Sequence, residues 1–190
     1  MAVIDSRQNG ILSVLAESNT DNPIDIIRAF ISNATGIELK SVIKDFSQKP
    51  GTRPSLSADW CGVRISDIRS FGTPYHKGIK GDISEAEDGT VISTVHQTLT
   101  VDVIFYGPNA EYKADTLRDA LWLGQNVDYL RSQGLTIQGC DDASTSFPEF
   151  VYEQWCNRAD LKMFIGRVVT RTYGIRDIAS VADSVEIIKG

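Results

Sequence analysis

The side chains best suited to chemistry in this sequence belong to two histidines and three cysteines. His76 and His96 are far apart, and neither is accompanied by other residues at the spacing of metal ligands. A nucleophilic cysteine needs a neighbouring base such as histidine, and no local motif supports such a pair. Cys61, Cys140 and Cys156 are an odd number at wide spacing, which favours reduced thiols over a disulfide framework. The sequence therefore predicts no catalytic residue, no cofactor and no metal site.

Asp141 and Asp142 are adjacent carboxylates, a pair able to bind a cation or to act as an acid and a base. They lie in a segment rich in serine and threonine, where neighbouring carboxylates usually belong to a solvated turn. The Gly-Ile-Lys-Gly stretch at residues 78–81 is too short for a phosphate-binding loop and lacks a strand-to-helix context. A small enzyme whose site combines Asp141, Asp142 and His76 stays an alternative. Loss of function without loss of assembly in variants of these residues would favour it.

The composition bounds the class of protein. The chain has 190 residues and 42% apolar residues, enough for one domain with its own core. The formal net charge is −6 and there is no basic run, which argues against a protein that binds nucleic-acid backbones by itself. Residues 1–5 lack the charged start of a signal peptide, and no apolar stretch is long enough for a membrane span. We therefore expect a soluble protein made in a cytoplasm, with no membrane partner.

The most regular pattern lies in residues 90–106, where apolar residues recur at every second position except Ser93 and Gln97, as in a long strand. The apolar positions are Val91, Val95, Leu99, Val101, Val103 and Phe105. After Gly107 and Pro108, Asn109 is placed to cap a helix with its side chain. The apolar residues of that helix, Ala110, Ala114, Leu117 and Leu121, follow at helical spacing. A strand that turns directly into a helix predicts a helix packed against a sheet.

A second long strand is predicted at residues 155–169. Its apolar face holds Trp155, Ala159, Leu161, Met163, Ile165 and Val169. The opposite face holds most of the polar residues, which are Arg158, Asp160, Lys162, Thr170 and Thr172. Because its length and pattern match those of residues 90–106, we expect the two strands to be antiparallel neighbours.

The rest of the chain gives shorter elements. Before the first long strand we expect a marginal helix or arm at 4–17, a helix begun by Pro23 and ended by Gly36, a short strand at 37–46, a loop at 47–58, a strand at 60–68 and a long irregular excursion at 71–89. Between the two long strands we expect a helix at 125–133, kinked at Gly124 and ended by Gly134, a short strand at 135–137 and an acidic turn-rich segment at 139–150. After the second long strand we expect a turn at Gly174 and a strand at 181–188. The predicted fold class is α+β, a mostly antiparallel twisted sheet with helices packed on one face. It forms a single domain at 23–190, preceded by an N-terminal arm or marginal helix at 1–22.

Several short motifs follow one another along the chain, none of them specific alone. They are Arg53-Pro54-Ser55-Leu56 before the strand at 60–68, Phe105-Tyr106-Gly107, Leu117-Arg118 with Leu121, Tyr129-Leu130, Gly134-Leu135, Tyr152-Glu153 and Arg158-Ala159-Asp160-Leu161. Their order and spacing resemble the neck and tail-terminator-like proteins of long-tailed bacteriophages. The resemblance covers residues 23–188. The glycine-rich segment 71–89 and the residues before 23 depart from it.

The resemblance implies a structural virion protein without catalysis or cofactor. Such proteins form a ring, commonly hexameric, that caps the tail tube, joins the tail to the head connector and leaves a central channel for DNA. The expected partners are further copies of the chain, the tail tube protein, the connector and neck proteins and, in a contractile phage, the sheath protein. The expected location is the tail or neck of the virion, with assembly in the host cytoplasm. Six copies would carry about −36, so DNA would pass without specific binding.

Contacts between copies or between rings are expected from exposed polar loops and from aromatic residues outside the core. The candidates are Arg53, Tyr75, His76, Lys77, Trp122, Glu153 and Arg158, with the segments 47–58 and 71–89 that hold the first four of them. Glu153 and Arg158 bracket the start of the second long strand, and we expect them to pair within or between subunits.

Two further alternatives stay open beside the enzyme. One is another neck component, such as a collar, a head–tail connector or a tail-completion protein. The other is a bacterial adaptor without a virion role, which would be monomeric or dimeric at high concentration.

Overall fold

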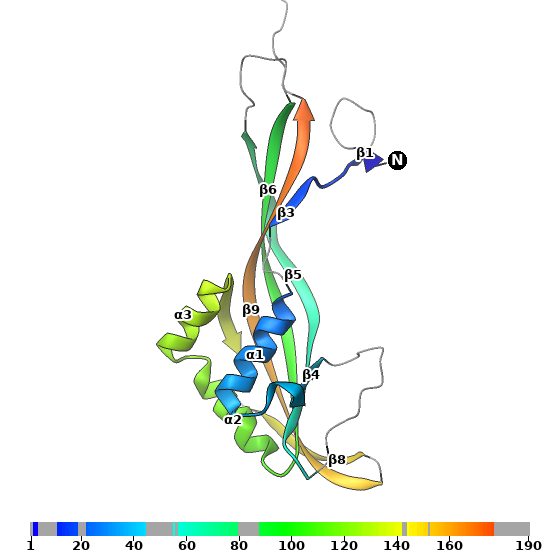
Figure 1. Cartoon of the computed structure of the whole chain (residues 1–190), viewed down its shortest axis with the longest axis vertical. Coiled ribbons are helices and arrows are strands. Elements are labelled where there is room, and N and C mark those ends of the chain that lie inside the picture. Colours follow the sequence, from blue (N-terminus) through cyan, green and yellow to red (C-terminus); the bar gives the residue numbers. More distant parts are fainter. Residues whose placement is uncertain are drawn as a thin grey trace, which may run out of the picture. The chain divides into compact units, whose positions relative to one another are not determined.

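The computed structural model describes residues 2–3, 11–18, 22–44, 55, 57–79, 88–141, 144–151 and 153–176 (Figure 1). Its elements in chain order are β1 (Ala2–Val3), β2 (Ile11–Leu12), β3 (Ala16–Ser18), α1 (Pro23–Thr35), a 3₁₀ turn η1 (Leu39–Ser41), β4 (Val42–Lys44), β5 (Trp60–Ile79), β6 (Asp88–Tyr106), α2 (Ala110–Ala120), α3 (Gly124–Ser132), β7 (Leu135–Cys140), β8 (Thr145–Val151) and β9 (Gln154–Arg176). The chain divides into two compact units. The first unit comprises Met1–Ser18, Thr73–Val95 and Thr170–Gly190, and the second comprises Asn19–Gly72 and His96–Val169.

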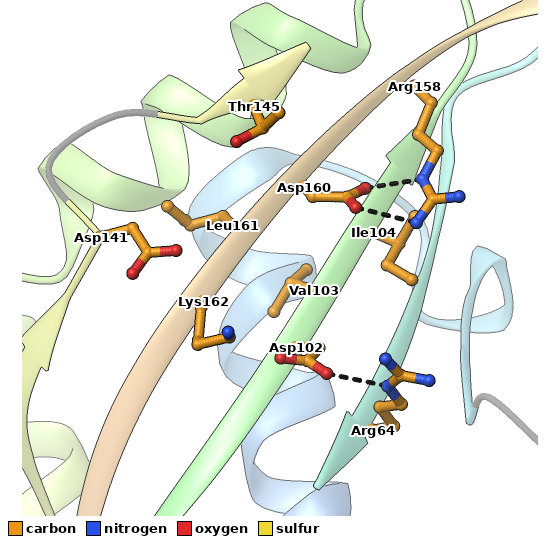
Figure 2. Close-up of a pocket in the computed structure, with 10 residues that line it drawn as sticks. All are labelled: Arg64, Asp102, Val103, Ile104, Asp141, Thr145, Arg158, Asp160, Leu161 and Lys162. Atoms are coloured by element: carbon orange, nitrogen blue, oxygen red, sulfur yellow. Dashed lines mark hydrogen bonds and ion pairs between the residues drawn. The ribbon is translucent and has the colours of Figure 1, made fainter. Parts of the chain in front are cut away.

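The second unit contains all three helices and a sheet in which β9, β6, β5 and β4 follow one another as hydrogen-bonded neighbours. The predicted pairing of the two long strands is confirmed, because β6 and β9 lie side by side and run in opposite directions (Figure 2). β7 and β8 also pair with β9, both antiparallel. β4 pairs with β5 in parallel, from Val42 opposite Cys61 to Lys44 opposite Val63. The sheet is therefore mostly antiparallel with one parallel edge, which agrees with an α+β fold.

The strand-to-helix unit at the centre of the sequence is confirmed as β6 and α2. The alternation correctly identified the buried side of β6, where Leu99, Val101, Val103 and Phe105 are fully buried. The predicted cap at Asn109 is wrong. Its side-chain amide donates instead to Asp59 Oδ2 at 2.9 Å, and its backbone N–H donates to Asp59 Oδ1, also at 2.9 Å. The turn after β6 is thereby fixed to the residue that precedes β5.

α1 begins at Pro23 and ends at Gly36, as predicted, with Gly36 in the left-handed conformation at φ 70°. Proline suits the first helical position because its missing N–H would have no partner there. Ile27, Phe30 and Ile31 are buried in one cluster with Leu117 of α2, Leu130 of α3 and alternate residues of β5, β6 and β9. All three helices thus contribute to the same core as the sheet.

Trp155 departs from the expected apolar face of the second strand. Ala159, Leu161, Met163 and Ile165 are buried as predicted, whereas Trp155 is 71% exposed. It lies at the start of β9, where the strand pairs with the short β8 and Trp155 is in register with Phe150. The apolar pattern continues into this hairpin although the core does not.

Several predicted irregular segments are strands, and the reason is pairing with a partner distant in sequence. Residues 71–79 continue β5, and residues 145–151 form β8 against β9. Both stretches expose most of their side chains, so they carry no alternation of apolar and polar residues by which to recognise them. Gly174 lies inside β9 rather than at a turn.

The remaining boundaries also differ. Of the described residues 37–44 in the predicted strand at 37–46, those at 42–44 form a strand, after the 3₁₀ turn. The break before α3 is complete, since α2 ends at Ala120 and α3 starts at Gly124; Gly134 has φ 74°, as its role as a helix end requires. Residues 45–54 and 80–87 and the predicted strand 181–188 lie outside the described residues.

In the first unit, the N-terminal residues are extended rather than helical. β1 pairs in parallel with β2, and β3 pairs antiparallel with β9, with Ala16 opposite Thr172. Arg171 Nε donates to Glu17 Oε2 at 3.0 Å across this pair. The marginal helix expected at 4–17 is therefore wrong for the described residues 11–17, because pairing of β2 with β1 and of β3 with β9 replaces helical hydrogen bonds. The alternative, an N-terminal arm, stays a prediction.

Candidate interaction surface

The residues first considered for chemistry form no site in the described part of the chain. No group of three or more histidine, cysteine, aspartate or glutamate residues there is placed to hold a metal ion. Burial raises the pKa of the Cys61 thiol to about 12, which keeps it protonated and non-nucleophilic. Asp142 lies outside the described residues. Among those residues, no helix has the length and apolar character needed to span a bilayer.

The polar side of β6 and β9 instead carries a cluster centred on Arg158 (Figure 2). Arg158 binds the Asp160 carboxylate with two nitrogens, Nε to Oδ1 at 2.7 Å and Nη2 to Oδ2 at 2.8 Å. Its Nη1 forms an ion pair of 3.2 Å with Glu149 of β8. The guanidinium carbon also lies 4.9 Å from the ring centroid of Phe147 and 5.9 Å from that of Tyr106. One side chain therefore links β8, β9 and β6.

The environment fixes the charge states in this cluster. The hydrogen bonds that Arg158 donates to Asp160 raise the pKa of Arg158 above its already high ordinary value, so the guanidinium stays charged. Burial raises the pKa of Tyr106 to about 12, and its ring stacks on Trp60 with centroids 4.2 Å apart. A permanent cation is thus held against a neutral aromatic pair, which is a structural arrangement rather than an acid–base one.

Beside this cluster lies a pocket of about 290 Å³, whose lining residues are shown in Figure 2. Arg64 of β5 donates from Nε to Asp102 Oδ2 of β6 at 2.9 Å across the pocket wall. Lys162 and Asp141 add one charge of each sign, and the backbone N–H of Asp141 donates to the Lys162 carbonyl at 2.9 Å. Because cations and carboxylates alternate, the pocket offers no concentrated charge for a phosphate or a metal ion.

Further along the same side lies a larger hollow of about 670 Å³, here called the groove. It is lined by Ser66, Asp67, Arg69, Phe71, Thr98, Thr100, Gln138, Lys162 and Phe164. Gln138 reaches over Gly166, whose missing side chain leaves room for it, and accepts a hydrogen bond from Thr98 Oγ1. Gly139 faces Phe164 across the β7–β9 pair. The groove therefore has two phenylalanine rings between polar walls.

The β8–β9 hairpin ends in two exposed aromatic residues, here called the knob. Phe150 and Trp155 face each other in register with ring centroids 5.2 Å apart, and they are 59% and 71% exposed. Glu153 lies beside them in the turn, exposed and with a positive φ of 61°. Paired aromatics outside a core are typical of a protein contact.

The described contact candidates belong to different elements of the chain. Tyr75, His76 and Lys77 are exposed, as expected, but on strand β5 rather than in a loop. Trp122 is exposed in the turn between α2 and α3. Arg53 lies outside the described residues. Whether these side chains contact other copies or rings stays a prediction.

The pairing of Arg158 within the chain needs correction. Its partners are Asp160 and Glu149, not Glu153. Arg158 lies opposite Phe147, whereas Glu153 is in the turn that joins the strands, five residues away along β9. At a rise of roughly 3.3 Å per residue, that separation is too large for an ion pair.

Sequence reasoning missed β8 and hence the knob and the Glu149 ion pair. The available signal was the presence of Phe147, Phe150 and Val151 in a segment otherwise made of acidic and small polar residues. The groove left no such signal, since its residues come from four strands.

Comparison with known proteins identifies a family. A protein-family model described as "Phage neck terminator protein" matches residues 23–190. No curated protein matches the chain. The matched residues begin at Pro23, the first residue of α1.

Proposed function

The chain belongs to the phage neck terminator protein family, and from this membership we propose that it forms the ring that ends the tail tube and joins the tail to the head connector. It is a structural protein of the phage neck, with its place in the tail or neck of the virion and other tail or neck proteins as partners. The observation that carries the proposal is the family match, which spans the entire predicted domain. The proposed partners are further copies in a hexamer, the tube protein, the connector and, in a contractile tail, the sheath.

The charge pattern of the sheet supports a channel-lining role. We infer that the helices cover one side of the sheet and that the polar side of β6 and β9 faces the channel. All three helices share a core with the alternate, apolar positions of the same strands. On the polar side, Arg158 and Arg64 are each paired with carboxylates. Such a wall has no continuous basic stripe, so DNA can pass without being held.

The experiment that tests this function is a phage from which the gene is deleted. The expected result is heads without tails, together with tails of irregular length, seen by electron microscopy of the lysate. Expression of the intact chain from a plasmid should restore joined particles. A normal yield of infectious, joined virions from the deletion phage would contradict the proposal.

A further inference from the structure

Two features of the second unit have complementary chemistry, and the channel-lining role accounts for the aromatic rings of neither. The knob, Phe150 with Trp155, presents aromatic surface beside an acidic residue, Glu153. The groove presents the rings of Phe71 and Phe164 beside exposed cationic side chains. Aromatic residues that are solvent-exposed in a single chain cost little to bury, because they have few rotamers to lose on binding.

We propose that the knob of one copy docks in the groove of the next copy, a contact that rests on the proposed ring. A ring of more than two copies needs two different patches on each chain, one for each neighbour. The knob and the groove are such a pair. The groove volume of about 670 Å³ falls in the range of roughly 300–1,000 Å³ typical of pockets that enclose ring-bearing ligands.

Charge complementarity supports a second copy as the occupant. Glu153 at the knob would meet Lys162, which is exposed at the groove, and Arg69, whose side chain is 77% exposed. Asp67 also lines the groove, but its carboxylate already pairs with Arg69 at 2.7 Å. DNA does not suit the groove, since the rings of Phe71 and Phe164 offer no hydrogen-bond donor to phosphate groups. The contact gives Glu153 an ion-pair partner in the next subunit, whereas Arg158 already has Asp160 and Glu149 in its own chain.

Removal of the aromatic residues tests the contact. Trp155→Ala and Phe71→Ala should each raise the dissociation constant of the ring by roughly 30-fold, the loss expected for one central aromatic contact. Native mass spectrometry over a concentration series measures it. Tyr112→Ala is the matched control, because Tyr112 on α2 is 68% exposed but belongs to neither feature. Thermal unfolding of the monomers should stay unchanged in all three variants, since Trp155 and Phe71 are 71% and 61% exposed.

A charge exchange tests the register of the contact. Glu153→Lys and Lys162→Glu should each weaken the ring, because each places like charges against each other. The double variant Glu153→Lys with Lys162→Glu should recover most of the lost affinity. General destabilisation of the fold cannot produce such recovery. Absence of recovery would overturn the register in which these two residues meet.

The outcomes separate the contact from the function on which it rests. Rings of normal affinity in both Trp155→Ala and Phe71→Ala would overturn the docking and leave the ring intact. Normal rings that no longer bind assembled tubes would also overturn it and assign the knob to the tube protein. A wild-type chain that forms no ring, alone or with tubes, would overturn the proposed function and the docking with it.

Discussion

The two sides of strands β6 and β9 differ in what their side chains contact. On one side, Val103 and Phe105 of β6 and Leu161 of β9 are fully buried against helices from the same chain. On the other side, Arg64 pairs with Asp102, and Arg158 with Asp160, at the edge of open pockets. The first side is completed by the chain itself. The second has its charges paired but its groove exposed, which is expected of a surface that other molecules complete.

This difference separates folding from assembly. Changes on the buried side should lower the free energy of unfolding and should affect a ring only by unfolding its subunits. Changes at the knob and the groove should alter association with little effect on the fold. The predictions below follow from that separation, beginning with the largest effect.

Truncation of the buried side should have the largest effect on stability. Phe105→Ala should lower the free energy of unfolding by about 3–5 kcal/mol, because it removes buried apolar surface and leaves a cavity. Urea denaturation followed by circular dichroism measures it. The control Ile68→Ala, at a half-exposed position of β5, should change the free energy by less than about 0.5 kcal/mol. Equal losses in the two variants would contradict the assignment of the sides.

The turn between β6 and α2 should tolerate no side chain at position 107, which is a glycine. Gly107 has φ 116°, and a Cβ there would lie 2.6 Å from the Ala58 carbonyl oxygen and 2.9 Å from Asp59 Cα. Because backbone atoms must move, Gly107→Ala should lower the free energy of unfolding by about 3 kcal/mol. Gly124→Ala is the control, since its Cβ would meet open space at the start of α3. Denaturation midpoints that are equal for the two variants would refute this reading of the turn.

On the polar side, a linked ion pair should matter more than an exposed one. Arg158→Ala leaves the carboxylates of Asp160 and Glu149 without their cation, and should cost about 2 kcal/mol of unfolding free energy. Arg69→Ala also breaks an ion pair, but the Arg69 side chain is 77% exposed against 20% for Arg158. Its effect should stay within about 0.5 kcal/mol. A loss in Arg69→Ala as large as in Arg158→Ala would show that burial does not decide the strength of these pairs.

At alkaline pH, the free energy of unfolding should depend on one ionisable group on each side of the sheet. At neutral pH neither group should affect it. Burial raises the pKa of Cys61 from 9.0 to about 12 and that of Tyr106 from 10.0 to about 12. The unfolded chain therefore releases these protons at a lower pH than the folded chain does, so the free energy of unfolding should fall as pH rises above about 9.

Chemical denaturation at several pH values between 7 and 11 measures this fall. Cys61→Ala should remove the part that begins near pH 9, and Tyr106→Phe the part that begins near pH 10. A wild-type free energy that stays constant between pH 9 and 11 would contradict both pKa shifts.

The same contrast explains how much could be predicted from the sequence. The buried side follows from periodicity, since alternation in residues 90–106 and 155–169 identifies Leu99, Phe105 and Leu161 without knowledge of their partners. Pro23 and Gly36 likewise define α1 from local chemistry alone.

The polar side could not be predicted in this way, because it depends on contacts between residues that are distant in the sequence, and local patterns do not reveal such contacts. Arg64 and Asp102 are 38 residues apart, and Arg158 meets Glu149 only because β8 pairs with β9. Residues 71–79 and 145–151 owe their strand structure to that kind of pairing. The resemblance nevertheless pointed to the correct family, which the family model matching residues 23–190 confirms, even where single elements were misassigned.

We propose that copies of this chain form the ring at the end of the phage tail. Native mass spectrometry over a concentration series, with electron microscopy of the largest species, is the decisive measurement. We expect a hexamer with a central hole, formed by the chain alone or on assembled tail tubes. A chain that stays monomeric at every concentration and does not bind the ends of tubes would contradict it.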